Sequence, residues 1–274
     1  MIRLCEVAQM TPQNYYARRS ARRRVEVDVA LVLELVRAER RHQPRLGVRK
    51  LYHLIQAELK AAGVKLGRDR LFQELRKEGL LVERKPSQWP KTTQFDANLP
   101  VFKNLIKGRP MSGSNQVWVA DITYIRTWEA FMFLSLITDR WSRKIVGFHL
   151  AETLESEGTL VALAMALKSL RKGQRPIHHS DRGCQYASHR YVKRVETAGL
   201  RMSMTEKNHG AENALAERVN GILKQEYWMD ENFPTKPQAR RAAAEGIYLY
   251  NHRRPHTALG FRTPAIVHDA VPKK

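Results

Sequence analysis

The stretch VWVADITYIR (117–126) is followed at short intervals by FMFLSLITD (131–139) and KIVGFHLAE (144–152). All three runs are rich in β-branched and aromatic residues, and the short connections between them are typical of strands in an antiparallel meander. They decide the fold class, because a meander of this kind supplies the first half of a sheet.

Helices and shorter strands alternate after the meander. The strands PIHHSD (176–181) and RMSMTE (201–206) are expected between helices over about residues 155–171, 188–199 and 211–229. A meander that continues into alternating helices and strands predicts an α/β fold, in which helices cover both faces of a mixed sheet.

The first hundred residues have a helical pattern instead. Thr11 and Pro12 are suited to begin a short helix, and apolar residues recur at helical spacing over about 25–41. Two further amphipathic helices, over about 48–62 and 68–77, are joined by a tight turn that contains glycine. This arrangement fits a helix-turn-helix, whose second helix can enter the DNA major groove, and an ordinary helical hairpin fits the same spacing.

The second helix of this pair carries three arginines. Arg68, Arg70 and Arg76 are placed where they could contact DNA phosphates or base edges. In an ordinary helical hairpin the same side chains would be solvated surface residues.

Composition and pattern divide the chain into four parts. We expect N-terminal helices over residues 1–44, a helix-turn-helix-like DNA-binding segment over 45–90, a linker over 91–115, and the α/β core with its C-terminal tail over 116–270. The linker is assigned because its residues are rich in proline, serine, glycine and asparagine and lack periodicity.

The net charge indicates the kind of partner. Lysine and arginine number 48 against 27 aspartates and glutamates, a net charge of +21. A protein this basic binds polyanions by default, because neutralising phosphates releases condensed counterions. The charge favours nucleic acid as the partner over the alternatives, an anionic membrane or an acidic protein. No apolar stretch approaches the ~18–20 residues of a spanning helix, and two cysteines cannot build a disulfide framework. These features predict a cytoplasmic protein rather than a membrane or secreted one.

Three carboxylates are candidates for chemistry. Asp121 lies in the middle of the first predicted strand, and Asp181 ends the strand at 176–181, where functional groups of α/β sheets collect. Glu217 belongs to a polar stripe on the helix over 211–229, whose other members are Asn213, Asn220 and Lys224. Each candidate also has an ordinary structural interpretation: a satisfied buried aspartate, a turn-capping aspartate and a solvated helix face.

Together the three carboxylates suggest a metal site. If they converge at one edge of the sheet, their hard oxygens would bind Mg²⁺ or Mn²⁺ rather than softer metals. Two such ions about 4 Å apart can activate an attacking oxygen and stabilise a leaving one in phosphoryl transfer. A zinc site at His178 and His179 is not expected, because no further ligand lies nearby at suitable spacing.

Four sequence motifs and the spacing between two of the candidate carboxylates are similar to those of a known protein family. The motifs are WVADITY (118–124), HHSDRGCQYAS (178–188), ENALAERVNGILKQE (212–226) and YNHRRPHTALGFRTP (250–264), and 35 residues separate Asp181 from Glu217. In this order and with this gap the chain resembles bacterial insertion-sequence transposases with a retroviral-integrase-like core. The similarity is to the second-reading-frame (OrfB) product of the IS-three family.

The resemblance implies an RNase H-like catalytic core. Asp121, Asp181 and Glu217 would be the acidic DDE triad that holds two Mg²⁺ or Mn²⁺ ions, and Lys224 and Asn220 would lie near the DNA end. The one departure is Glu212, at a position where the family commonly has aspartate.

The resemblance further implies a metal-dependent transposase that cleaves DNA at the ends of the element and transfers the strands to a target. Its partners would be double-stranded DNA, the first-reading-frame product and other copies of the chain on DNA, in the bacterial nucleoid and without a membrane. The alternatives are a catalytically inactive DNA-binding regulator and a nuclease on the same core. The complete triad argues against the first, and the C-terminal motifs argue against the second. Whether Arg254 and His256 of the last motif contact DNA or only pack stays open.

Overall fold

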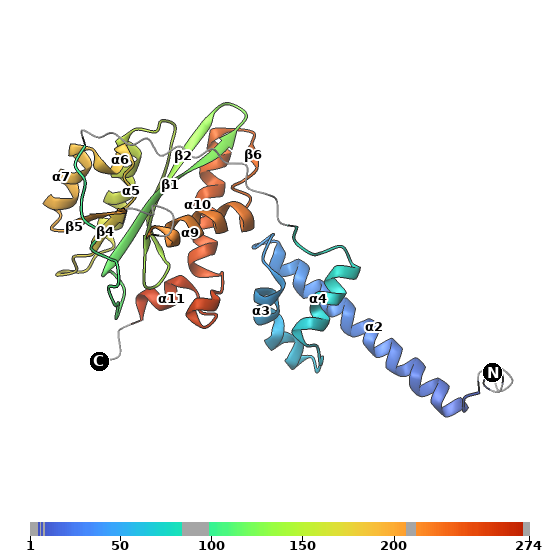
Figure 1. The fold of residues 1–274 in the computed structure, drawn as a ribbon. Helices are drawn as coiled ribbons and strands as arrows, with labels where there is room; N and C mark the ends of the chain where they lie inside the picture. The colour runs from blue at the N-terminus through green and yellow to red at the C-terminus, as the bar shows by residue number, and fades with distance from the viewer. Residues whose placement is uncertain (1–4, 6, 8, 84–98, 207–211, 271–274) are drawn as a thin grey trace. The chain divides into compact units, whose positions relative to one another are not determined.

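The chain forms two compact units in a computed structural model, residues 1–83 and residues 84–274 (Figure 1). The structure describes residues 5, 7, 9–83, 99–206 and 212–270, and of residues 22–27 only the backbone. The end of the predicted DNA-binding segment, the first part of the predicted linker and the expected helix start at residue 211 therefore lie outside the described residues. Within the described ranges, no helix is both long and apolar enough to cross a membrane.

The described part of the first unit includes the helices α2 (Pro12–Arg40), α3 (Val48–Ala61) and α4 (Arg68–Lys77). The two separate helical stretches predicted before residue 42 are one continuous helix, because the alanines and arginines between them are strong helix formers with no glycine or proline. Thr11 caps it as expected, and its hydroxyl accepts a hydrogen bond from the Asn14 amide at 3.2 Å.

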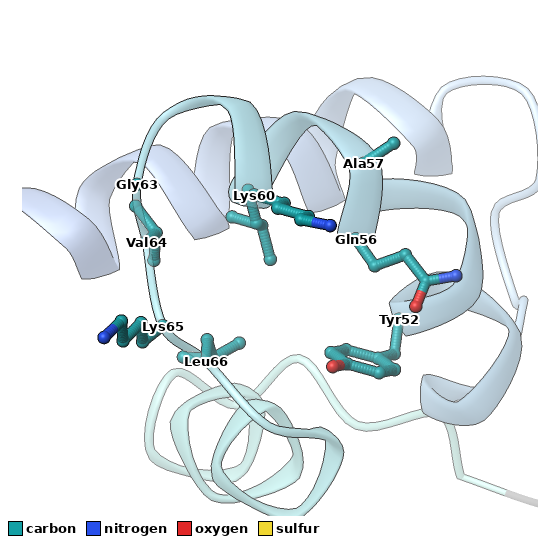
Figure 2. Close-up of a pocket in the computed structure, with 9 residues that line it drawn as sticks. Tyr52, Gln56, Ala57, Lys60, Gly63, Val64, Lys65 and Leu66 are labelled. Atoms are coloured by element: carbon teal, nitrogen blue, oxygen red, sulfur yellow. The ribbon is translucent and has the colours of Figure 1, made fainter.

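The helices α3 and α4 have the bounds that the sequence predicts, to within one residue. They pack on α2 through a buried aliphatic core: Val32, Val36, Leu46, Leu51, Ile55, Leu59, Leu71 and Leu75. The turn after α3 passes through Gly63, whose φ of 74° favours glycine. A pocket of about 520 Å³ lies beside this turn. Its lining residues include Tyr52, Gln56, Lys60 and Lys65 (Figure 2).

The second unit is built on a six-stranded mixed sheet with the order β3-β2-β1-β4-β5, and β6 pairs with the far end of β1. Strands β1, β2 and β3 form the predicted antiparallel meander, and β4 and β5 continue the sheet in parallel with β1. The bounds are β1 (Val117–Thr127), β2 (Phe131–Asp139), β3 (Ile145–Ala151), β4 (Ile177–Ser180), β5 (Arg201–Met204) and β6 (Asn232–Phe233).

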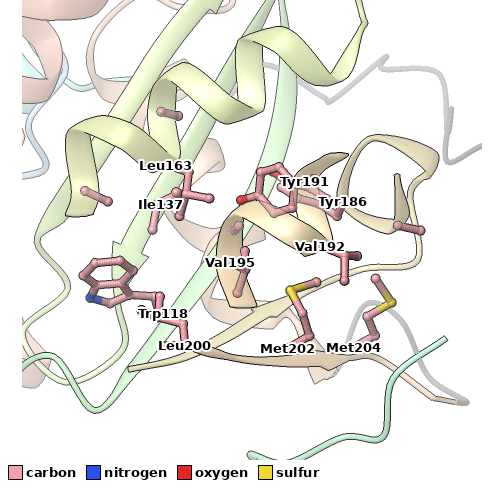
Figure 3. Close-up of a cluster of buried hydrophobic side chains, with 14 of the residues drawn as sticks. Trp118, Ile137, Leu163, Tyr186, Tyr191, Val192, Val195, Leu200, Met202 and Met204 are labelled. Atoms are coloured by element: carbon pink, nitrogen blue, oxygen red, sulfur yellow. The ribbon is translucent and has the colours of Figure 1, made fainter. Parts of the chain in front are cut away.

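Helices cover both faces of this sheet, as predicted (Figure 1). One face packs on α5 (Ser156–Lys168), α6 (Cys184–Ala187) and α7 (His189–Thr197), and Figure 3 shows the core between them. The other face packs on α9 (Ala214–Glu226) and α10 (Lys236–His252). Side chains alternate along β1, so Trp118 and Ala120 face the first layer and Ile125 faces the second.

The sequence patterns did not predict every element. They missed the 17-residue helix α10, although Thr235 caps it by accepting a hydrogen bond from the Gln238 amide. They also missed the short helix α6 and the C-terminal helix α11 (Pro264–Asp269). The described part of the predicted linker, residues 99–115, has neither helix nor strand, but Ile106 is buried in the core beside Val117 and Ile177.

Candidate active site

Strand register brings Asp121 and Asp181 to the same level of the sheet. In the parallel pair β1–β4, Val119 lies opposite His179, and each aspartate comes two residues later on its own strand. Neighbouring strands are about 4.8 Å apart, so equal offsets keep the two side chains close. Because β4 ends at Ser180, the sheet opens at this level, and both aspartates line one pocket of about 60 Å³.

Backbone and side-chain donors hold the two carboxylates. Asp121 accepts a hydrogen bond from the Ile122 amide at 2.9 Å through Oδ1, and one from Asn220 Nδ2 at 2.7 Å through Oδ2. Asp181 Oδ1 accepts from the Gly183 amide at 3.0 Å. A Cβ at position 183 would lie 3.0 Å from that same oxygen, so glycine leaves the space that the carboxylate uses.

The electrostatics of the pair disfavour two negative charges. Burial and, after it, the nearby charge of Asp181 together raise the pKa of Asp121 to about 7, against the two hydrogen bonds that lower it. The charge of Glu217 makes a smaller contribution in the same direction. A cation between the carboxylates would relieve this repulsion.

The polar stripe of α9 is mostly buried against β1. Asn213, Asn220 and Lys224 are 3%, 6% and 9% exposed, so the interpretation as a solvated helix face is wrong for these three. Asn213 Nδ2 donates to the Ala120 carbonyl at 3.1 Å. Burial lowers the pKa of Lys224 to about 8, while the charge of Asp121 opposes the shift. The stripe therefore faces the aspartate pair.

Glu217 is the exception on this stripe, because its side chain is exposed and does not line the pocket. Among the residues that the structure describes, no three histidine, cysteine, aspartate or glutamate side chains are grouped closely enough to hold a metal ion. The structure thus brings Asp121 and Asp181 together, and Glu217 lies one helical turn before Asn220. Whether it completes the triad stays a prediction.

The donors at the pocket fit a hard divalent cation. Two carboxylates converge there, and Asn220 Oδ1 is a buried oxygen with no hydrogen-bond partner among the described residues. Oxygen-only sets of this kind suit Mg²⁺ or Mn²⁺. His178 and His179 serve the core instead: His178 Nε2 is hydrogen-bonded to the Tyr191 hydroxyl and His179 Nδ1 to Ser203 Oγ, each at 2.8 Å. Burial lowers their pKa values to about 3 and about 4.

Arg254 and His256 of the C-terminal motif are buried rather than presented to solvent. Arg254 is 2% exposed and forms two hydrogen bonds of 2.7 Å to the carboxylate of Glu226, at the end of α9. Its third nitrogen lies 3.0 Å from His256 Nε2. This pairing fixes the segment just after α10 to the helix that carries Glu217 and Lys224, and no sequence signal revealed it.

Glu212, the departure from the expected motif, also has a structural role. Its carboxylate accepts hydrogen bonds from the Glu206 amide and from Asn104 Nδ2, the latter at 3.2 Å. It therefore ties the start of the α9 region to the segment before β1.

The three predicted DNA-contacting arginines are all exposed on α4, in the helical unit. Arg68 forms an ion pair of 2.8 Å with Asp69, and the Arg76 guanidinium lies 5.0 Å from the centre of the Phe72 ring. Exposure is compatible with DNA contact, which stays a prediction for Arg68, Arg70 and Arg76.

Comparison with known proteins gives matches along most of the chain. Two family models described as "Integrase core domain" match residues 112–209 and 198–264. The 31 kDa protein of insertion element IS600 from Shigella sonnei is 36% identical over 266 residues, 96% of each chain. The transposase InsF of insertion sequence IS3A from Escherichia coli K12 is 33% identical over 210 residues, 76% of this chain and 72% of the relative.

The fold also has a counterpart among solved structures. The chain is similar to one in the simian T-cell lymphotropic virus intasome, with a TM-score of 0.52 and 20% identity over 83% of this chain and 76% of the other. This likeness supports the expected RNase H-like fold.

Proposed function

The chain belongs to the integrase-core transposases of bacterial insertion sequences, of the IS-three family, and we propose that Asp121, Asp181 and Glu217 are the carboxylates of its active site. As a transposase it is a polynucleotidyl transferase that acts in DNA transposition. The observation that carries the proposal is the aspartate pair at the open edge of the sheet, where each side chain lines the same pocket.

The cofactor in this proposal is a pair of Mg²⁺ or Mn²⁺ ions held by the three carboxylates. Bound there, such ions would polarise the phosphodiester and favour the ionised form of the attacking hydroxyl. The raised pKa of Asp121 supports this assignment, because a carboxylate that resists ionisation alone is stabilised by a nearby cation.

The other residues of the site orient the two aspartate carboxylates or supply charge beside them. Asn220 and the Ile122 amide fix the direction of the Asp121 carboxylate, and the Gly183 amide does the same for Asp181. Lys224, buried beside Asp121, supplies a positive charge that would attract a phosphate of the DNA end.

DNA binding is assigned to both units. The net charge of +21 suits double-stranded DNA at the element ends and at the target, and the exposed arginines of α4 would contact its backbone. Replacing Arg68 and Arg70 by alanine should weaken duplex binding and flatten its salt dependence without loss of helicity. Unchanged affinity of this variant for duplex DNA would show that the helix-turn-helix assignment is wrong. We further place the first-reading-frame product and other copies of this chain in the complex, acting at the nucleoid.

The test is a joining assay with labelled element ends, Mg²⁺ or Mn²⁺, and the first-frame product supplied. Asp181→Asn and Glu217→Gln keep the side-chain shape and remove one negative charge, so joining should fall by orders of magnitude while DNA affinity stays level or rises slightly. Near-normal joining by either variant would mean that the chemistry lies elsewhere. DNA that is bound but unaltered by the wild type would indicate a regulator, and cleavage without joining would indicate a nuclease.

A further inference from the structure

Tyr186 is a buried tyrosine in the wall of the aspartate pocket. It lies on α6, five residues after Asp181, is 2% exposed, and lines the pocket together with both aspartates. Its hydroxyl oxygen is buried and has no hydrogen-bond partner among the residues that the structure describes. A buried hydroxyl without a partner is costly, so its presence calls for an explanation.

Packing does not explain the hydroxyl. The Tyr186 ring is fixed edge-to-face against Tyr191 (Figure 3), with ring centres 5.4 Å apart. The same ring lies 6.1 Å from the His178 ring. A phenylalanine would make the same ring contacts and would leave no orphaned polar atom. Packing therefore needs the ring but gives the oxygen no role.

The other fully buried tyrosines have partners. The Tyr191 hydroxyl is hydrogen-bonded to His178 Nε2 at 2.8 Å, and the Tyr250 hydroxyl donates to the Arg143 carbonyl at 3.0 Å. Tyr186 differs from both in lying beside two carboxylates, whose charges, after burial and Tyr191, raise the pKa of its hydroxyl. The unpaired donor and the two acceptors are thus close neighbours.

We propose that Tyr186 is a positioning residue, whose hydroxyl donates a hydrogen bond to a carboxylate of Asp121 or Asp181 when these side chains hold a divalent cation. The inference rests on the proposed function of this pair. A carboxylate that binds a cation through one oxygen keeps lone pairs for a second partner, and an ionised carboxylate is a stronger acceptor than a neutral one. This hydrogen bond would give the buried hydroxyl the partner that it lacks among the described residues.

The test is Tyr186→Phe, read out by Mn²⁺ binding to the full chain without DNA and by thermal unfolding. Because the ring stays and an unpaired buried hydroxyl is removed, Tm should be unchanged or higher, while Mn²⁺ affinity should fall about 3- to 10-fold. The matched control is Tyr250→Phe, which loses a satisfied hydrogen bond and should lower Tm by a few degrees with wild-type Mn²⁺ affinity.

Two results would overturn the inference. Wild-type Mn²⁺ affinity in Tyr186→Phe would show that the hydroxyl does not act on the carboxylates. A drop in Tm as large as that of Tyr250→Phe would show an ordinary structural role. Failure of the proposed function itself appears elsewhere, as undiminished Mn²⁺ binding in Asp181→Asn.

Discussion

Asp121 and Asp139 lie on neighbouring strands of one sheet, and their carboxylates have opposite surroundings. Asp139 is fully buried and accepts three hydrogen bonds of 2.6–2.7 Å, from the Asn115 amide and from the amide and hydroxyl of Ser142. Asp121 is half-buried, accepts two hydrogen bonds, and shares its pocket with a second carboxylate.

The difference separates a structural carboxylate from one placed for chemistry. Around Asp139 three donors match the acceptor oxygens, so the carboxylate has its hydrogen-bond partners within the protein. Around Asp121 the neighbours include like charge, and its pKa is raised to about 7. The surroundings of Asp121 therefore disfavour its ionised carboxylate, which a bound cation would stabilise. Such an unfavourable placement is expected of a functional site.

The largest expected effect is on DNA joining. Asp121→Asn should lower the joining rate by orders of magnitude, because it removes a charged ligand. Asp139→Asn should leave the rate per folded molecule within about 2-fold, since its carboxylate does not line the pocket. Joining assays normalised to the folded fraction measure both. Equal losses of joining rate in the two variants would contradict the distinction between a carboxylate placed for chemistry and a structural one.

The second effect is on the free energy of unfolding, which Asp139→Asn should lower more than Asp121→Asn. Asp139→Asn places an amide NH₂ against the buried donors of Asn115 or Ser142, which should cost about 2–4 kcal/mol of unfolding free energy. Asp121→Asn should cost little, because Asn220 Oδ1 has no partner in the described structure and a flipped Asn220 amide could accept from the new group. Urea unfolding curves of the two variants provide the comparison, and a larger loss in Asp121→Asn would be the contrary result.

The smallest effect is the response to pH. The folded-state pKa of Asp121 is raised from its ordinary 3.8 to about 7, so between these values the unfolded chain has lost a proton that the folded protein keeps. This contribution to stability is present below about pH 4 and is lost as pH rises through about 7. Without metal, the unfolding free energy of Asp121→Asn minus that of the wild type should therefore increase as the pH rises from 5 to 8.

Mg²⁺ should stabilise the folded protein more at high pH than at low pH, since protons compete with it for the carboxylates. The rise in Tm on adding Mg²⁺ should be larger at pH 8 than at pH 5 in the wild type and in Asp139→Asn. It should vanish in Asp121→Asn. Equal shifts at the two pH values would argue against ligation by Asp121.

The sequence by itself determined the local elements and the family. Hydrophobic periodicity and turn residues are properties of a few consecutive residues, and they predicted the β1–β3 meander and the bounds of α3 and α4 to within about two residues. The motifs and the gap between Asp181 and Glu217 predicted the transposase family, which the relatives confirm.

Only the tertiary structure decided which polar groups are satisfied. The burial of Asn213, Asn220 and Lys224 depends on α9 lying over β1, and the pairing of Arg254 with Glu226 joins residues 28 positions apart. Hydrogen bonds and desolvation act between residues that the fold brings together, so no sequence window contains them. For the same reason the sequence named Asp121 as one candidate but could not distinguish its surroundings from those of Asp139.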